Sequence, residues 1–247
     1  MAHIDHDNLP SYESTREQSL PTYEPLQRNI AFPAQFFIYQ KTGLVRPFTA
    51  FIGTEESSPL YHIDLGTVML DPGQPNVVLH ADASQDSPIV ASVKAAPDGD
   101  RYQIQTGSSY PPNPEGLKVS SRRGSRKYTF SVENEAGENA KGQERQVFEW
   151  RPSRGKQVRS LGLRDYGWKL VRLSGSNSDA SSTSSAEKAD KVVAAWSKYS
   201  ESGSKKIFGF RFFEESTSED QRKGWEIMAV MTGLAIWHVD IMEGYMY

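Results

Sequence analysis

Short apolar runs, in which apolar residues alternate with polar ones or stand together, recur along the chain from residue 35 onward. They cover residues 35–40, 44–52, 60–69, 77–80, 88–93, 101–105, 126–132, 145–150, 168–173, 191–199 and 206–213. Runs of this length and period are typical of β-strands. Turn-forming sequences rich in Gly, Pro, Asp and Asn separate them, for example residues 41–43, 71–73, 97–99, 111–114 and 135–137. The pattern predicts a mainly β protein with about twelve short antiparallel strands, arranged as a barrel or a sandwich.

The apolar stretch over residues 225–241 is longer than these runs and has a different pattern. Placed on a helix, its apolar residues cover almost the whole circumference, so the helix must be enclosed by lipid or by protein. Its uninterrupted apolar part, residues 227–237, is much shorter than the roughly 20 residues that span a membrane, and Glu226 and His238 flank it. We therefore expect a buried core helix over about residues 219–242, and not a tail anchor or an interfacial helix.

Two segments lack this patterning. Residues 1–33 are polar and contain Pro10, Pro21, Pro25 and Pro33, which predicts a disordered tail. The serine-rich sequence SGSNSDASSTSSA at residues 174–186 is typical of a long flexible loop. The remainder of residues 34–247 is long enough to form one large β domain.

Composition narrows the class of protein. The chain has no cysteine, which excludes a disulfide framework, a thiolate zinc site and a cysteine nucleophile. Its first residues lack the basic and apolar regions of a signal peptide. We expect a cytoplasmic protein that can associate with membranes as a peripheral protein.

Four segments carry a resemblance to a known family. They are FIYQKTG at residues 37–43, KVVAAW at 191–196, FGFRFF at 208–213 and the helix at 227–241, which ends in HVD followed by Ile. The chain resembles the tubby C-terminal-like superfamily, in particular LURP-one-related and fungal tubby-like proteins, over residues 34–243. The resemblance implies an antiparallel barrel of about twelve strands that encloses the C-terminal helix. Because tubby proteins bind phosphoinositides through Lys and Arg on the barrel wall, it also implies a non-catalytic lipid-binding module.

Positive charge is concentrated in one region. The chain carries a net charge of −3, yet residues 118–172 contain 14 Lys and Arg against 6 Asp and Glu. Within this region Arg122, Arg123, Arg126 and Lys127 are expected to bind a phosphoinositide or another anionic headgroup, at ~1 kcal/mol for each cation near a charged surface. Ser125 fits a basophilic kinase site, and a phosphate there would cancel much of the local charge. The alternative is an exposed basic turn that binds nothing.

The predicted tail contains a duplicated motif. Residues 9–13 read LPSYE and residues 20–24 read LPTYE. A Pro-x-Tyr segment in polyproline II geometry suits the aromatic groove of a WW domain, and two copies raise avidity. Both copies resemble the L-P-x-Y ligands of adaptors for HECT-type ubiquitin ligases. The expected contact residues are Leu9, Pro10, Tyr12, Leu20, Pro21 and Tyr23. The alternative is that Pro and Tyr recur by chance in a Pro-rich tail.

No catalytic motif is present in the sequence: it contains no HExxH, nucleophile elbow, Walker A or GxGxxG element. His238 falls on the apolar helix and is expected to be a satisfied core or helix-end residue, while His62 and His80 lie in separate predicted strands. The aromatic residues of the basic region alternate along strands, as expected for the inner side of a barrel and not for a nucleic-acid stacking platform. We therefore expect a binding or adaptor protein that is not an enzyme and uses no metal or cofactor.

Overall fold

The computed structural model describes residues 30–41, 48–66, 74–96, 101–107, 115–122, 125–133, 145–161, 164–173, 190–199, 204–213 and 219–245. The two L-P-x-Y motifs and the serine-rich sequence at residues 174–186 lie outside these ranges.

Twelve strands form a closed antiparallel barrel, in which each strand pairs with its neighbours in sequence and β1 pairs with β12. The strands are β1 (Gln35–Gln40), β2 (Phe48–Gly53), β3 (Pro59–Leu65), β4 (Val77–His80), β5 (Ile89–Ala95), β6 (Arg101–Thr106), β7 (Glu115–Arg122), β8 (Ser125–Glu133), β9 (Arg145–Ser153), β10 (Gly167–Arg172), β11 (Lys191–Lys198) and β12 (Lys206–Phe212). The predicted mainly β fold is confirmed, and of the two arrangements that the sequence pattern allowed the protein adopts the barrel. Closure leaves no sheet edge for another chain to pair with.

Strand β7 is the one that the apolar pattern missed. Among its described side chains only Leu117 and Val119 contact the core, and the residues that follow them, Lys118 and Ser120, are exposed. Two isolated apolar residues in a polar sequence do not make a recognisable run. The strand is held by pairing with β6 and β8, which depends on residues distant in the sequence.

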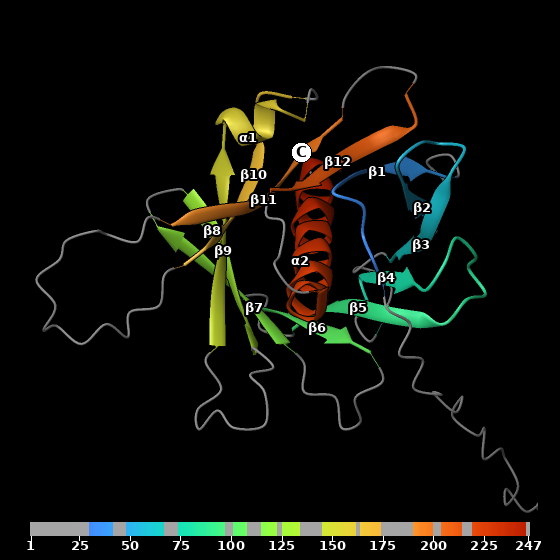
Figure 1. The fold of residues 1–247 in the computed structure, drawn as a ribbon, viewed down its shortest axis with the longest axis horizontal. Helices are drawn as coiled ribbons and strands as arrows, with labels where there is room; N and C mark the ends of the chain where they lie inside the picture. Colours follow the sequence, from blue (N-terminus) through green and yellow to red (C-terminus); the bar gives the residue numbers. More distant parts are fainter. Residues whose placement is uncertain are drawn as a thin grey trace, which may run out of the picture.

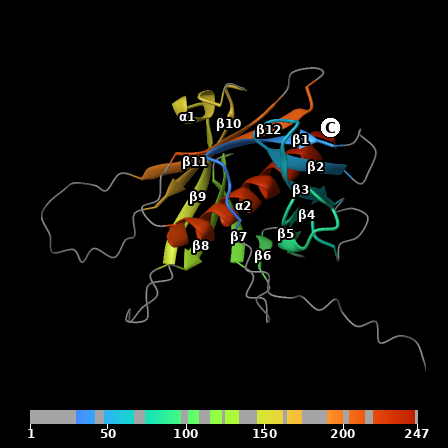
Figure 2. The ribbon, with the colours of Figure 1, turned by 45° about the vertical axis from the view of Figure 1, so that its right-hand side comes forward.

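Helix α2 (Glu219–Tyr245) passes through the barrel, as Figures 1 and 2 show from two directions. Its residues from Trp225 to His238 are buried except for the half-buried Ile227, and even Glu226 is only 3% exposed. The ring of Trp237 packs against Phe208 of β12 with a centroid separation of 5.8 Å. The expected buried core helix is therefore confirmed. None of the helices in the described ranges is long and apolar enough to cross a membrane.

One end of the barrel carries the β7–β8 and β9–β10 connections, among others, together with the C-terminal end of the central helix. Because the strands alternate in direction, the β7–β8 turn and the β9–β10 connection, which contains helix α1 (Lys156–Arg159), lie at the same end. The C-terminal part of α2 also lies there, since Lys198 Nζ at the end of β11 is 3.4 Å from Asp240 Oδ2. His238 Nε2 lies 2.9 Å from the carbonyl oxygen of Gly66, which follows β3. Figures 1 and 2 show α1 and the C-terminal end of α2 at the same end of the barrel, and we call this the α1 end.

Candidate functional site

Exposed cations surround α1. Four of them lie in the β9–β10 connection, and a fifth lies at the start of β8 at the same end of the barrel. We name these five residues the basic rim: Arg126, Arg154, Lys156, Arg159 and Arg164. Within the described part of the chain, none of the four in the connection forms an ion pair. Their charges are therefore available to a ligand.

The fold of the connection explains why its cations point outward. Gly155 N–H donates to Ser153 Oγ at 3.0 Å, and Ser160 N–H donates to Lys156 O at 2.8 Å, which closes one helical turn. The apolar Val158 and Leu161 are buried, at 0% and 5% exposure, against the ends of β10 and β11. Since these two residues face the barrel, the basic residues between and around them face solvent.

Tyr166 lies beside these cations and is 47% exposed. Its backbone is fixed, because Ser197 Oγ donates to Tyr166 O at 2.9 Å. Partial burial and the charge of Asp240 raise the pKa of Tyr166, and Arg154 acts in the opposite direction. The rim thus contains an aromatic ring with a polar tip, held between cations and the C-terminal part of α2.

Two residues of the basic run identified in the sequence, Arg126 and Lys127, lie on opposite sides of β8. Tyr128 is buried inside the barrel, and strand alternation places Arg126 on the same side at the barrel mouth and Lys127 on the outer wall. Burial raises the pKa of Tyr128 to about 12, while Arg126 acts in the opposite direction through its charge and a hydrogen bond. Arg126 therefore belongs to the rim, and Lys127 does not.

Lys127 is instead part of an ion-pair network on the outer wall. Its Nζ lies 3.2 Å from Glu149 Oε1, and Arg151 Nε contacts the same oxygen. Although burial acts to raise it, hydrogen bonds and charges from Arg151 and Lys127 lower the pKa of Glu149. Arg151 also lies 3.0 Å from Asp190 Oδ2. The charge of Lys127 is thus partly neutralised.

Other predicted site residues are placed only in part. Arg122 and Ser125 are register partners where β7 meets β8. Their side chains, and all of Arg123, lie outside the described part of the chain. The same holds for all six predicted contact residues of the L-P-x-Y motifs, which are Leu9, Pro10, Tyr12, Leu20, Pro21 and Tyr23.

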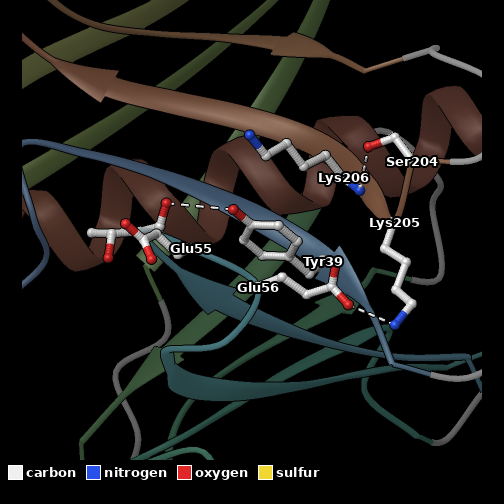
Figure 3. A pocket seen from close by; sticks show the side chains of 7 residues that line it. Tyr39, Glu55, Glu56, Ser204, Lys205 and Lys206 are labelled. Carbon is white, nitrogen blue, oxygen red and sulfur yellow. Dashed lines mark hydrogen bonds and ion pairs between the residues drawn. The ribbon is translucent and has the colours of Figure 1, made fainter.

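A polar groove of about 440 Å³ lies over β1 (Figure 3). It is lined by Tyr39, Thr54, Glu55, Glu56, Ser204, Lys205 and Lys206. Lys205 pairs with Glu56 across it, and Lys206 Nζ lies 4.2 Å from the centre of the Phe37 ring. Burial and the charges of Glu55 and Glu56 raise the pKa of Tyr39. With two acids and two cations in its lining, the groove has no net charge to attract a ligand.

His62 and His80, which belong to separate predicted strands, lie next to each other on the outer wall. His62 Nε2 lies 3.0 Å from Asp64 Oδ1, and His80 Nε2 lies 2.9 Å from Asp64 Oδ2. Both imidazoles are buried, and the Asp64 side chain is 29% exposed. The alternation of His62 and Asp64 with the core residues Ile63 and Leu65 was a signal that the first two share the outer face of β3. Among the described residues, no group of three or more His, Cys, Asp or Glu side chains could hold a metal ion.

Comparison with known proteins gave no match: no family model, no curated protein and no solved structure is similar to the chain. The class that the fold defines is a closed twelve-stranded antiparallel barrel around a C-terminal helix. This architecture is consistent with the tubby-like fold that the sequence resemblance implies.

Proposed function

We propose that this protein is a non-catalytic binding module of the tubby C-terminal-like superfamily that holds anionic phospholipid headgroups, phosphoinositides among them, at its basic rim. The observation that carries the proposal is the group of four exposed cations at positions 154, 156, 159 and 164, which lack an ion-pair partner within the described residues. Arg126 lies at the same end of the barrel, as does the backbone of Arg122 at the end of β7.

The binding free energy expected from the rim cations favours a reversible association with the membrane. At ~1 kcal/mol for each cation near an anionic surface, four cations contribute about 4 kcal/mol, which corresponds to a dissociation constant of roughly 1 mM. Binding at cellular lipid densities then depends on the remaining basic residues and on Tyr166. Such binding is weakened by salt, because exposed charges are screened within about 10 Å.

Tyr166 supports a membrane surface as the partner. Aromatic rings with a polar tip favour the headgroup level of a bilayer, where the ring contacts acyl chains and the hydroxyl stays in water. In the proposed complex the cations bind phosphates and the Tyr166 ring enters the interface between them. A phosphate on Ser125 weakens this complex, because it adds negative charge at the β7–β8 turn.

A vesicle sedimentation experiment tests the proposal. The full chain is mixed with phosphatidylcholine vesicles, and with the same vesicles containing phosphatidylserine or a phosphoinositide. We expect sedimentation with the anionic vesicles only, and its loss as salt is raised. Equal sedimentation with neutral and anionic vesicles, or none with either, contradicts the proposal.

The duplicated L-P-x-Y motif supports a second candidate function, an adaptor that recruits HECT-type ubiquitin ligases through their WW domains. The supporting observation is the repetition of LPSYE and LPTYE within residues 9–24. A titration of a WW domain with the wild-type chain and with the Tyr12→Ala/Tyr23→Ala variant tests it. The wild type is expected to bind more tightly, and equal affinity ends this proposal. The two functions are compatible, since the motifs and the rim are separate parts of the chain.

A further inference from the structure

The imidazole of His80 is held between two hydrogen-bond acceptors. Its Nδ1 lies 2.8 Å from the backbone carbonyl oxygen of Ser87, and its Nε2 lies 2.9 Å from Asp64 Oδ2. A carbonyl oxygen only accepts, and so does an ionised carboxylate, so both ring nitrogens must donate. A neutral imidazole carries one N–H only. The contact therefore requires a second proton on the ring of His80, shared with the carboxylate of Asp64.

The contacts of His62 indicate that it is neutral, so that the extra proton belongs to His80. The Nε2 atom of His62 lies 3.0 Å from Asp64 Oδ1, so a neutral His62 that carries its proton on Nε2 donates to the other carboxylate oxygen. Its Nδ1 is buried and has no hydrogen-bond partner among the described residues, which fits a neutral ring. Asp64 then accepts from both imidazoles, and His80 is a buried imidazolium that is paired with the half-buried carboxylate of Asp64.

The doubly protonated ring of His80 links residues 81–88 to the barrel wall, because it donates both to Ser87 O and to Asp64. This segment connects β4 to β5, and its Ser87 carbonyl is one of the two acceptors that hold His80. Two further bonds fix its ends, from His62 N–H to Asp82 O at 2.7 Å and from Ala81 N–H to Pro88 O at 2.8 Å. The segment and its bonds lie over His62 and His80, which are 0% and 5% exposed.

The other charged groups around His80 are acidic or distant. The segment itself carries Asp82, whose Oδ1 accepts from Ser84 N–H at 2.8 Å, and the exposed Asp86. On β5 the register partner of His80 is the apolar Ile89. Within these described neighbours no Lys or Arg balances Asp64, so the proton on His80 is the positive charge that the carboxylate meets.

We propose that His62, Asp64 and His80 form a proton-binding latch that holds residues 81–88 against the outer wall of β3 and β4. When the shared proton is lost, a lone pair on His80 faces an acceptor at 2.9 Å, and the ring can keep only one of its two hydrogen bonds. The carboxylate is the stronger acceptor, so the ring keeps its proton on Nε2, the Ser87 carbonyl loses its donor, and the segment is released. The latch is thus closed at the lower pH and opens as the pH rises, independently of lipid binding at the rim.

Nuclear magnetic resonance on the full chain tests the latch in two measurements. Long-range proton–nitrogen spectra report which ring nitrogens of each histidine carry protons. We expect two protonated ring nitrogens on His80 and one on His62 at a pH at which the amides of Ala81 and Asp82 are protected from exchange. As the pH rises and His80 loses its second proton, amide exchange of Ala81 and Asp82 is expected to accelerate by about tenfold beyond the base-catalysed change seen elsewhere in the barrel.

The Asp64→Asn variant gives the decisive comparison. Its amide oxygen accepts from His62, and its NH₂ donates to the lone pair of a neutral His80, so the segment stays latched without an extra proton. We expect the pH dependence of exchange at Ala81 and Asp82 in this variant to fall to the base-catalysed change seen elsewhere in the barrel. The control is Asp86→Asn, which changes the net charge by the same amount at a residue of the segment itself and is expected to respond as the wild type does.

Two results overturn the proposal. The first is a single protonated ring nitrogen on His80 in the wild type at a pH at which the amides of Ala81 and Asp82 are protected. The second is a pH response in Asp64→Asn equal to that of the wild type. Because the first result comes from the wild-type chain alone, a variant that does not fold leaves the proposal open to contradiction.

Discussion

Trp150 on the barrel wall donates a hydrogen bond of 2.8 Å from its indole Nε1 to the hydroxyl of Thr232, in the middle of α2. Both residues are fully buried, and the Thr232 hydroxyl donates in turn to Met228 O at 2.7 Å. The lining around them is apolar and aromatic, so this polar contact fixes which turn of the helix faces β9. A helix that was apolar all round would slide or rotate in the barrel at little cost, and this bond opposes that movement.

Replacing Thr232 by Val tests the importance of this bond. The two side chains have nearly the same shape, but Val leaves the buried indole N–H of Trp150 without a partner. We expect the free energy of unfolding to fall by about 1–3 kcal/mol. Chemical denaturation measures it, with Thr232→Ser as the control that keeps the hydroxyl. If Thr232→Val is as stable as the wild type, the bond does not hold the helix.

Two glycines in strands give a matched test of packing. A Cβ on Gly167 would lie 2.2 Å from the carbonyl oxygen of Trp196 on the neighbouring strand, whereas a Cβ on Gly116 would meet no atom within 4 Å. Gly167→Ala is expected to destabilise the barrel by about 1–3 kcal/mol, because the backbone of β10 and β11 must move apart. Gly116→Ala is expected to be neutral or to stabilise by about 0.5–1 kcal/mol. Equal effects of the two substitutions in a thermal melt would show that β10 and β11 are not this close.

The pH dependence of stability tests the burial of His238. Burial lowers its pKa from the ordinary 6.5, and the bond to Gly66 O acts in the opposite direction. Because the folded pKa is the lower one, the unfolded chain binds more protons once the pH falls below 6.5. Stability contributed by the neutral ring is therefore complete above that pH and is lost as the pH falls toward the folded pKa, by at most ~1.4 kcal/mol for each pH unit.

Denaturant unfolding of the wild type and of His238→Gln over this acidic range measures that contribution. The variant is expected to lose stability less steeply as the pH falls. Parallel curves for the two proteins would show that His238 is not the group responsible. The sign is opposite to that of the His80 latch, which weakens as the pH rises, so the two effects are separable.

Tyr166 is predicted to strengthen binding to anionic vesicles through its ring. Removing a half-exposed aromatic side chain that enters the interface costs about 1 kcal/mol, or roughly fivefold in affinity. The control is Ile89→Ala, since Ile89 is the other large apolar residue exposed within the described ranges and lies on β5. Tyr166→Ala should weaken vesicle sedimentation and Ile89→Ala should not. Identical losses in the two variants would mean that the ring does not act at the membrane.

The sequence predicted eleven of the twelve strands and the buried helix because the patterns that mark them are local. Inward residues such as Phe148 and Trp150 alternate with polar ones, and the enclosed helix is apolar over almost its whole circumference. The candidate sites depend on which strands are neighbours, and local patterns do not contain that information. His62 and His80 meet because β3 pairs with β4 in the register that places Ile63 opposite Leu79.

The basic region shows the same limit. Its excess of positive charge was evident from counting, but strand alternation places the adjacent Arg126 and Lys127 on opposite faces of the wall. Arg154 and Arg159 join Arg126 only because antiparallel order brings the β7–β8 turn and the β9–β10 connection to one end. A count along the chain cannot distinguish a cation in the rim from one that is paired with Glu149.

We propose that the basic rim around α1, and not positive charge in general, binds anionic lipid. The direct test compares Lys156→Glu/Arg159→Glu with Lys94→Glu/Lys118→Glu, a pair on the walls of β5 and β7 that changes the net charge equally. The measurement is the affinity of each protein for phosphatidylcholine vesicles containing phosphatidylserine. We predict that the rim pair loses about 2 kcal/mol or more, roughly thirtyfold in affinity, and that the wall pair binds nearly as the wild type does. Equal affinities of the two variants would contradict the claim.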